Sequence, residues 1–186
     1  MAGIKDTNEA DLIEQVKAGQ RRAFDRLVEP HAPRLLALAR RMLASTSEAE
    51  EAVQNALASV WINRRRLDSG RPVGGYLTTV ILNKCRDRLR RRKAASFLGF
   101  GQGLEEAVAP DDAPDPENSA LDRQELARVK LEIERLPVRL REALVLVAID
   151  GRSQREAAEL LGVSEKTVET RVYRARNRLR EKLEFS

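Results

Sequence analysis

The stretch that most constrains the fold lies near the C-terminus, at residues 151–176, GRSQREAAELLGVSEKTVETRVYRAR. Ser153 followed by Glu156 forms a capping box, which predicts the start of a helix. Gly162 ends this helix, because glycine adopts the backbone conformation of a tight turn at little cost, and Ser164 caps a second helix. Two amphipathic helices joined by a tight glycine turn predict a helix-turn-helix.

The second of these helices has a basic outward face. Val168, Val172 and Ala175 recur at helical spacing and form its apolar side. Residues 164–183 hold seven basic and three acidic residues, a net charge of +4. A solvated helix at the edge of a bundle can carry the same charge. The capped first helix and the glycine turn favour instead a helix that enters the major groove of DNA.

Composition restricts the class of protein. A chain of 186 residues is enough for one or two small domains, and its pI of about 9.7 and net charge of +5 favour an anionic partner. Nucleic acid is the first candidate, and an acidic membrane surface the second. The sequence has no apolar run near the ~18 residues of a membrane span, no signal-peptide pattern and one cysteine, so we expect a cytoplasmic protein without membrane insertion.

The N-terminal part reads as one helix after another, without a convincing strand. Apolar spacing predicts helices at 11–18, 23–29, 35–43 and 76–93, and a longer one that Ser47 and Glu50 would cap and that would run to about Leu67. Residues 68–75, DSGRPVGG, predict a loop. In the C-terminal part, helices at 121–136 and 138–149 precede the helix-turn-helix. We therefore expect an all-α fold.

Residues 84–93, KCRDRLRRRK, hold seven basic residues and one acidic residue, a net charge of +6. A solvated helix end is one explanation, since cations suit the C-terminal end of the helix dipole. So many like charges repel each other unless a polyanion neutralises them. The run therefore favours phosphate binding.

The charge and the proline content of the chain change after Ala94. Residues 96–120 carry six acidic residues and no basic one, and three prolines fall within 104–120. This composition is typical of a flexible linker, whose charge either keeps it soluble or imitates nucleic acid. We predict two small helical domains, 1–95 and 121–186, joined by the acidic linker 96–120. Limited proteolysis should first cut the chain in this linker.

We find no constellation typical of an active site. The only histidine, His31, lies between prolines without a partner for nucleophilic or metal chemistry. Cys85 lies on the apolar stripe with Ile81 and Leu89, and Trp61 on the apolar stripe of its own helix, so both are expected in the core. The sequence therefore predicts a protein that is not an enzyme, with no metal site and no cofactor.

These segments together resemble bacterial RNA polymerase sigma factors of the sigma-70 family, in the extracytoplasmic-function (ECF) group. The resemblance covers residues 11–183. Residues 136–180 are similar to region four, and residues 23–43, AFDRLVEPHAPRLLALARRML, to the first segment of region two. Residues 47–61, SEAEEAVQNALASVW, resemble the segment that docks on the polymerase clamp, and residues 70–93 the segment that melts and binds the minus-ten element.

The resemblance implies a protein that binds core RNA polymerase and directs promoter recognition, DNA melting and transcription initiation at a specific set of promoters. Its partners would be the clamp of the largest subunit, the flap of the second-largest subunit, promoter DNA and an anti-sigma factor, and it would be a monomer when free. The residues implied at the minus-thirty-five element are Lys166, Thr167, Glu169, Thr170, Arg171, Tyr173, Arg174, Arg176 and Arg178. Those implied at the minus-ten element are Arg71, Val73, Tyr76, Asn83, Lys84, Asp87, Arg88 and Arg91. Those implied at the clamp are Glu50, Glu51, Val53, Gln54, Asn55 and Leu57.

Some positions depart from the family pattern. The clamp segment is less acidic than usual, Tyr76 stands where Trp is common, and Glu169 stands where Lys or Arg is frequent. The tyrosine still offers a ring on which an unpaired base can stack. The glutamate changes which base pair the helix would read.

Two other functions remain open at this stage. The first is a stand-alone helix-turn-helix regulator, which would be dimeric and bind duplex DNA without polymerase. The second is a protein that mimics a sigma factor and titrates an anti-sigma factor. The intact basic faces at 84–93 and 166–182 argue against such a decoy, which need not keep them.

Overall fold

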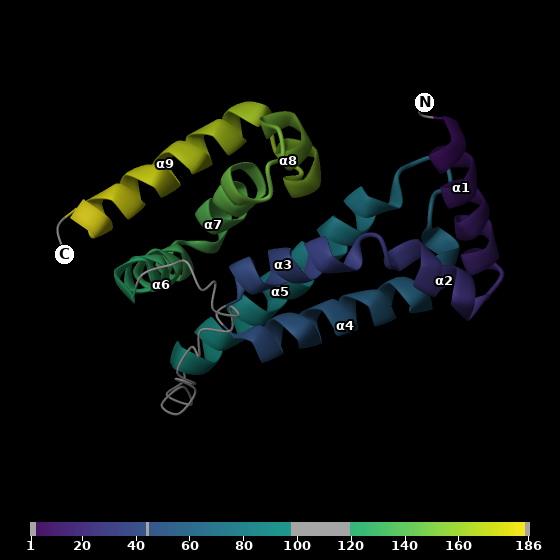
Figure 1. The fold of residues 1–186 in the computed structure, drawn as a ribbon, viewed down its shortest axis with the longest axis horizontal. Coiled ribbons are helices and arrows are strands. Elements are labelled where there is room, and N and C mark those ends of the chain that lie inside the picture. Colours follow the sequence, from purple (N-terminus) through teal and green to yellow (C-terminus); the bar gives the residue numbers. More distant parts are fainter. Residues whose placement is uncertain (1–2, 44, 98–119, 185–186) are drawn as a thin grey trace.

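The computed structural model of the chain describes residues 3–43, 45–97 and 120–184, and every regular element in these ranges is helical, which confirms the all-α prediction (Figure 1). The predicted linker 96–120 lies outside the described residues except at its two ends. The N-terminal unit consists of α1 (Gly3–Lys17), α2 (Arg21–Val28), α3 (Ala32–Met42), α4 (Thr46–Ile62), the short η1 (Arg64–Arg66) and α5 (Val73–Phe97). The C-terminal unit consists of α6 (Ala120–Arg135), α7 (Val138–Leu144), η2 (Val145–Ile149), α8 (Gln154–Leu161) and α9 (Glu165–Glu184).

The start of α4 differs from the prediction. The cap is Ser45, whose Oγ accepts a hydrogen bond from the backbone N–H of Glu48 at 3.3 Å, and not Ser47 with Glu50. A capping residue must keep an extended backbone, as Ser45 does, whereas Ser47 already lies in the first helical turn. The carboxylate of Glu50 pairs instead with Arg40 of α3.

The end of α4 also differs, because the helix stops at Ile62 and not near Leu67. The side-chain amide and the backbone N–H of Asn63 both donate to the carbonyl of Ser59, at 2.9 and 3.1 Å, so Asn63 closes the end of the helix. The 3₁₀ turn η1 follows, and Leu67 is buried beyond it. The turn lets the chain change direction before α5.

The long basic helix α5 begins at Val73, three residues earlier than predicted. The backbone N–H of Val73 donates to Oε1 of Glu9 in α1, at 2.7 Å. The Glu9 side chain of α1 therefore satisfies one of the backbone N–H groups that have no partner within the first turn of α5. A Cβ at Gly74 would lie 3.0 Å from Cε1 of His31, so a larger residue at this position would require the imidazole to shift.

The predicted helix 138–149 is present, but its second half, η2, is wound as a π-helix. The N–H of Asp150 donates to the carbonyl of Val145 at 2.8 Å, five residues back. This wider turn presents Asp150 and the residues after it toward the N-terminal unit.

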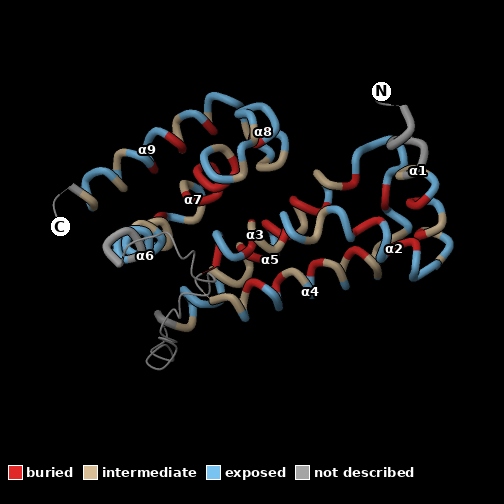
Figure 2. Tube along the Cα trace, in the orientation of Figure 1, coloured by how far each residue is buried: buried red, intermediate tan, exposed pale blue. Residues whose placement is uncertain are grey.

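The two units share buried side chains, whereas the sequence indicated two separate domains (Figure 2). One cluster of buried side chains runs from Leu38, Leu77 and Ile81 of the N-terminal unit to Leu146 and Val168 of the C-terminal unit. Cys85 belongs to this cluster, which confirms its predicted place in the core. Helices α3 and α5 contact α7, η2 and α8, so the two units pack against each other (Figure 1).

Among the described residues, no helix has both the length and the hydropathy that crossing a membrane requires.

Candidate nucleic-acid and polymerase interface

The helix-turn-helix has the predicted local geometry. The backbone N–H of Ser153 donates to Glu156 at 2.8 Å, and the N–H of Glu156 donates to the Ser153 Oγ at 3.2 Å, which confirms the capping box. The Ser153 hydroxyl also donates to the Glu156 carboxylate, at 2.7 Å, and this hydrogen bond, together with that from the Ser153 N–H, lowers the pKa of the Glu156 carboxyl. Gly162 ends α8 with φ of +65°, a left-handed conformation that favours glycine.

The second helix, α9, divides into two faces. Val168, Val172 and Ala175 are buried against the rest of the C-terminal unit. The opposite face carries the side chains predicted for the minus-thirty-five element, and Tyr173 is its most exposed aromatic ring at 66 %. Exposed members of this face are Lys166, Glu169, Tyr173, Arg174, Arg176 and Arg178, while Thr167, Thr170 and Arg171 are half-buried.

Local hydrogen bonds and ion pairs already involve four of these residues. Lys166 Nζ lies 2.8 Å from the Glu169 carboxylate, so the base and the acid partly neutralise each other. The hydroxyl of Thr170 donates to the carbonyl of Lys166, which leaves its methyl group for outside contacts. Thr167 belongs to the cap of α9, because its N–H donates to the Ser164 Oγ at 3.2 Å. This confirms Ser164 as the capping residue.

The residues predicted for the minus-ten element lie on or just before α5. Arg71 and Arg91 are exposed, Lys84 is half-buried, and Tyr76 is 39 % exposed at the start of the helix. Val73 is buried, so in this conformation its side chain is not accessible to DNA. Asp87 pairs with Arg90 one turn further on.

Arg86 is a member of this face that the sequence reasoning did not single out. Its Nη1 donates to Oδ1 of the exposed Asn83 at 2.8 Å, and its other nitrogens reach Glu142 of α7. The only signal in the sequence was its membership of the basic run 84–93.

The residues predicted to contact the clamp lie along α4. Glu50, Glu51, Gln54 and Asn55 are exposed, whereas Val53 and Leu57 are half-buried. Beside them, α2 and α4 form a largely apolar groove. Its walls include Phe24, Val28, Gln54, Leu57, Trp61 and Ile62.

Trp61 only partly fits its predicted role as a core residue. It packs against the buried cluster but is half-buried and lines the groove. Its ring lies 5.4 Å from that of Phe24, and the guanidinium of Arg21 lies 5.1 Å from the Trp61 ring centroid. Ile62 is 73 % exposed at the groove's end. The sequence reasoning missed Trp61 and Ile62 as surface residues, because helical spacing does not show which part of an apolar stripe stays uncovered.

Comparisons with known proteins agree with this geometry. The family model for sigma-70 region 2 matches residues 27–95, and the model for sigma-70 region 4 matches residues 126–179. The RNA polymerase sigma factor CnrH of Cupriavidus metallidurans is 37 % identical over 172 residues, which are 90 % of each chain. The ECF RNA polymerase sigma factor SigM of Mycobacterium tuberculosis is 34 % identical over 95 % of this chain and 85 % of its own.

Solved structures show the same fold. CnrH in complex with the cytosolic domain of CnrY has a TM-score of 0.68 and 33 % identity, over 95 % of this chain and 97 % of the other. The sigma factor RpoE of Bartonella quintana, in complex with the anti-sigma factor NepR, also has a TM-score of 0.68, with 26 % identity over 88 % of this chain and 98 % of the other. The chain therefore belongs to the sigma-70 family of RNA polymerase sigma factors, in the ECF group.

Proposed function

We propose that this protein is a sigma factor that binds core RNA polymerase in the cytoplasm and directs it to a specific set of promoters. The observation that carries the proposal is the presence, in one chain, of a basic helix-turn-helix face on α9, a basic α5 and a largely apolar groove beside α4. A DNA-binding regulator needs the first of these features. A factor that bridges polymerase and promoter needs all three, and it performs no chemistry of its own.

The face of α9 is proposed to read the minus-thirty-five element. Arg174 is exposed one turn after Thr170, and its fork of donors suits the O6 and N7 atoms of guanine. Glu169 accepts hydrogen bonds and suits the amino group of cytosine once Lys166 releases it. Arg176 and Arg178 lie further along the helix and would hold phosphates, which set the register of the protein on DNA but carry no sequence information.

The start of α5 and its basic stretch are proposed to hold the non-template strand of the minus-ten element. An unpaired base taken out of the stack needs a surface on which to rest, and Tyr76 offers a partly exposed ring. Lys84, Arg88 and Arg91 supply charge along the same helix for the backbone of that strand.

The exposed face of α4 and the adjoining groove are proposed to dock on the clamp of the largest polymerase subunit. Gln54 and Leu57 belong both to the predicted clamp set and to the groove wall, which extends the set to Trp61 and Ile62. Such an apolar centre with a charged rim is typical of a specific protein interface. The C-terminal unit would meet the flap of the second-largest subunit.

An anti-sigma factor is the proposed partner of the protein when it is not bound to polymerase. The relative from Bartonella quintana was solved with its anti-sigma factor, and the groove and the exposed apolar side chains of α6, Leu126 and Leu131, are surfaces that a partner would cover. The free protein would be a monomer, with domains at 1–95 and 121–186 and the linker 96–120 between them.

Run-off transcription tests the proposal. Purified core polymerase is supplied with this protein on a library of genomic promoter fragments, and transcripts are expected from a subset only. A dimeric protein that binds duplex DNA tightly in the absence of polymerase and yields no transcripts would instead be a stand-alone regulator. Binding to an anti-sigma factor without binding to core polymerase and without any transcript would indicate a sigma-mimicking protein.

A further inference from the structure

Helix α5 begins in a stretch whose own residues give a helix little support. Residues 72–75 read PVGG. Pro72 has no side-chain oxygen that could accept a hydrogen bond from the free N–H groups of the first turn, as a serine or an aspartate would. Gly74 and Gly75 lose more backbone freedom in a helix than any other residue. A helix that starts here therefore needs support from elsewhere in the chain.

Glu9 of α1 gives this support. The backbone N–H of Val73 donates to its Oε1 at 2.7 Å, and the Glu9 side chain is half-buried. A hydrogen bond to a carboxylate is stronger than one between neutral groups, and negative charge at a helix N-terminus interacts favourably with the helix dipole. Glu9 therefore acts as the capping residue of α5, although it lies 64 positions away in the chain.

Helix α1 also contacts the loop that precedes α5. The carboxylate of Glu14 accepts a hydrogen bond from Lys17 Nζ at 2.8 Å and another from the side chain of Ser69, and the two lower the pKa of its carboxyl. The turn η1, before the loop, lies against α1 as well. The same helix thus reaches the chain on both sides of residues 70–72.

The loop itself is compact. Its two ends, Leu67 and Val73, are both buried. Between them, the N–H of Gly70 donates to Oδ1 of Asp68 at 2.9 Å, which is the hydrogen bond of an Asx turn. The loop therefore reaches the start of α5 from a fixed direction, and Glu9 binds the point at which the loop becomes a helix.

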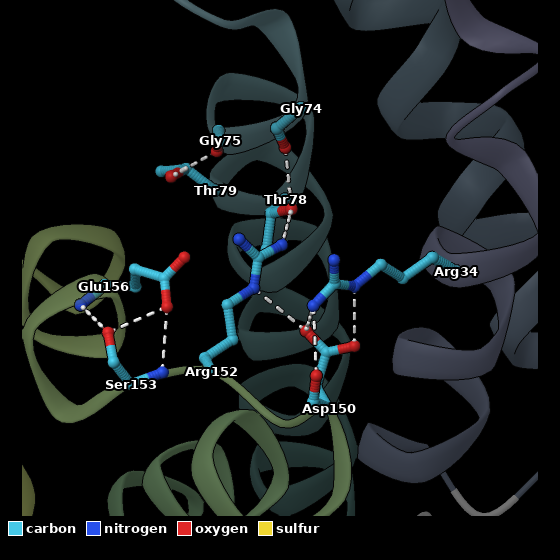
Figure 3. Close-up of polar contacts among 9 residues, drawn as sticks. All are labelled: Arg34, Gly74, Gly75, Thr78, Thr79, Asp150, Arg152, Ser153 and Glu156. Carbon is cyan, nitrogen blue, oxygen red and sulfur yellow. Dashed lines mark hydrogen bonds and ion pairs between the residues drawn. The ribbon is translucent and has the colours of Figure 1, made fainter. Parts of the chain in front are cut away.

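Two further hydrogen bonds join the first turn of α5 to the second (Figure 3). The hydroxyls of Thr78 and Thr79 donate to the carbonyls of Gly74 and Gly75, at 2.7 and 3.1 Å. The imidazole of His31 lies against Gly74 from outside the helix. Both hydrogen bonds involve carbonyl groups, so they leave the N–H end of the turn to the carboxylate from α1.

Tyr76 lies in the turn that Glu9 holds, and its ring is 39 % exposed. An unpaired base can stack on this ring only while the turn is formed. The apparent affinity for the base therefore falls with the fraction of molecules in which the turn is intact. A first turn with two glycines unwinds more often once its N-terminal hydrogen bond is lost.

We propose that Glu9 is a positioning residue for the minus-ten strand: by holding the first turn of α5, it keeps the ring of Tyr76 ready to stack on an unpaired base. Glu9 acts through Val73 and does not itself touch DNA. It lies outside the match to the region 2 family model, which begins at residue 27. The inference rests on the proposed function of Tyr76, but the hold on the turn is tested without DNA.

Amide hydrogen exchange of the full chain, followed by NMR, tests this hold. Glu9→Ala is expected to speed exchange at residues 73 and 77–79 by about tenfold, because the loss of a hydrogen bond to a charged group lets the turn open more often. Glu9→Gln keeps an acceptor oxygen and should exchange nearly like the wild type. Asp11→Ala is the matched control, since Asp11 is an exposed carboxylate on the same helix. Unchanged exchange in Glu9→Ala would overturn the proposal.

A compensating substitution distinguishes the hold on the turn from a general effect on folding. A Cβ at Gly75 would lie in ordinary contact with Leu160, at 4.0 Å, and alanine favours a helix more than glycine does. Gly75→Ala should therefore restore slow exchange in the Glu9→Ala background, and a double variant without recovery would overturn the proposal. Glu9→Asp, which withdraws the carboxylate by one methylene, replaces Glu9→Ala if circular dichroism shows that the latter does not fold.

Positioning of the base is tested with the protein bound to core polymerase. A fluorescent single strand that carries the minus-ten element is compared with strands in which one base at a time is removed to leave an abasic site. At the position where base removal weakens wild-type binding, Glu9→Ala is expected to cost about tenfold on the intact strand and little on the abasic one. Glu9→Gln should bind both strands like the wild type. An equal loss on both strands in Glu9→Ala would overturn the positioning role.

Tyr76→Ala separates this inference from the proposed function. Weak strand binding by Tyr76→Ala, together with unchanged binding by Glu9→Ala, would overturn the positioning role and leave the proposed function intact. If Tyr76→Ala binds the strand like the wild type, and no abasic site weakens binding, the proposed base contact of α5 is refuted and the positioning role with it.

Discussion

Arg88 of α5 and Glu51 of α4 form an ion pair in which Nη1 lies 2.8 Å from Oε2. The same guanidinium also binds Glu48 at 3.1 Å, and this hydrogen bond is the main reason that the pKa of Arg88 is raised. Arg88 is a predicted contact of the minus-ten strand, and Glu51 is a predicted contact of the polymerase clamp. A single ion pair therefore joins the two proposed surfaces.

We predict that Glu51→Gln strengthens binding of the minus-ten strand by the protein bound to core polymerase. Arg88 is then released from one carboxylate that competes with phosphate. The pair is partly exposed, so the gain is expected to be small, about two- to fivefold. Fluorescence anisotropy at saturating core polymerase measures it. Glu50→Gln is the matched control, because Glu50 pairs with Arg40 and not with Arg88, and an equal gain in this control would contradict the prediction.

The face of α9 should separate base reading from phosphate binding. Arg174→Ala is expected to lose roughly 1–3 kcal/mol at the preferred promoter and to relax the preference at one base pair. Arg178→Ala should weaken all promoters alike and lower the salt dependence by about one phosphate contact. Transcription from a library with randomised minus-thirty-five bases distinguishes the two effects.

Glu169→Lys should change the preferred base and not merely weaken binding. The substitution replaces an acceptor with a donor, and it also removes the partner of Lys166. The same promoter library provides the measurement. Identical base preferences in the wild type, Arg174→Ala and Glu169→Lys would show that this face does not read DNA.

Ile62 should contribute to polymerase binding and not to folding. Its side chain is largely exposed at the end of the α2–α4 groove, so Ile62→Ser is expected to leave the melting temperature unchanged. Losing the burial of one aliphatic side chain at the interface should weaken binding to core polymerase by roughly tenfold. Ile62→Leu keeps the apolar contact and should bind like the wild type in the same titration. A lowered melting temperature for Ile62→Ser would contradict this account.

Gly162 should matter through its backbone conformation alone. Its φ is +65°, and a Cβ there would have no atom within 4 Å, so Gly162→Ala adds strain without a clash. We expect a loss of about 1–2 kcal/mol in the free energy of unfolding, measured with urea. Gly162→Asn should lose less, because asparagine tolerates the left-handed region better than alanine. Equal losses in the two variants would contradict the backbone explanation.

Cys85 should be inert in the folded protein. Burial, with a further contribution from the negative charge of Glu142, raises the pKa of its thiol to about 12. The thiolate fraction near pH 8 is then roughly a thousandfold below that of an ordinary thiol, and alkylation should follow unfolding. Because the folded-state pKa lies above the unfolded value, the contribution of the neutral thiol to stability is complete below about pH 9 and declines as the pH rises toward 12. Rapid alkylation of the native chain at pH 8 would contradict this assignment.

The amino-acid sequence by itself determined the features that depend on near neighbours. The capping box of Ser153 and Glu156, the glycine end of α8 and the Ser164 cap of α9 all involve residues within a few positions of each other. Helical periodicity likewise identified Val168, Val172 and Cys85 as buried and the opposite face of α9 as exposed. Local backbone geometry makes these relationships readable in a single sequence.

Only the tertiary structure decided the features that depend on how the helices pack. Glu9 closes the start of α5 from 64 positions away, and Trp61 lines a groove because α2 leaves one side of it uncovered. The sequence indicated two units joined by an acidic linker, but the contact of Arg34 with Asp150 and of Arg86 with Glu142 depends on where α3 and α5 lie relative to η2 and α7. A charge in a sequence shows its sign but not its partner, because pairing across 56 or 116 positions is set by the packing of the whole chain.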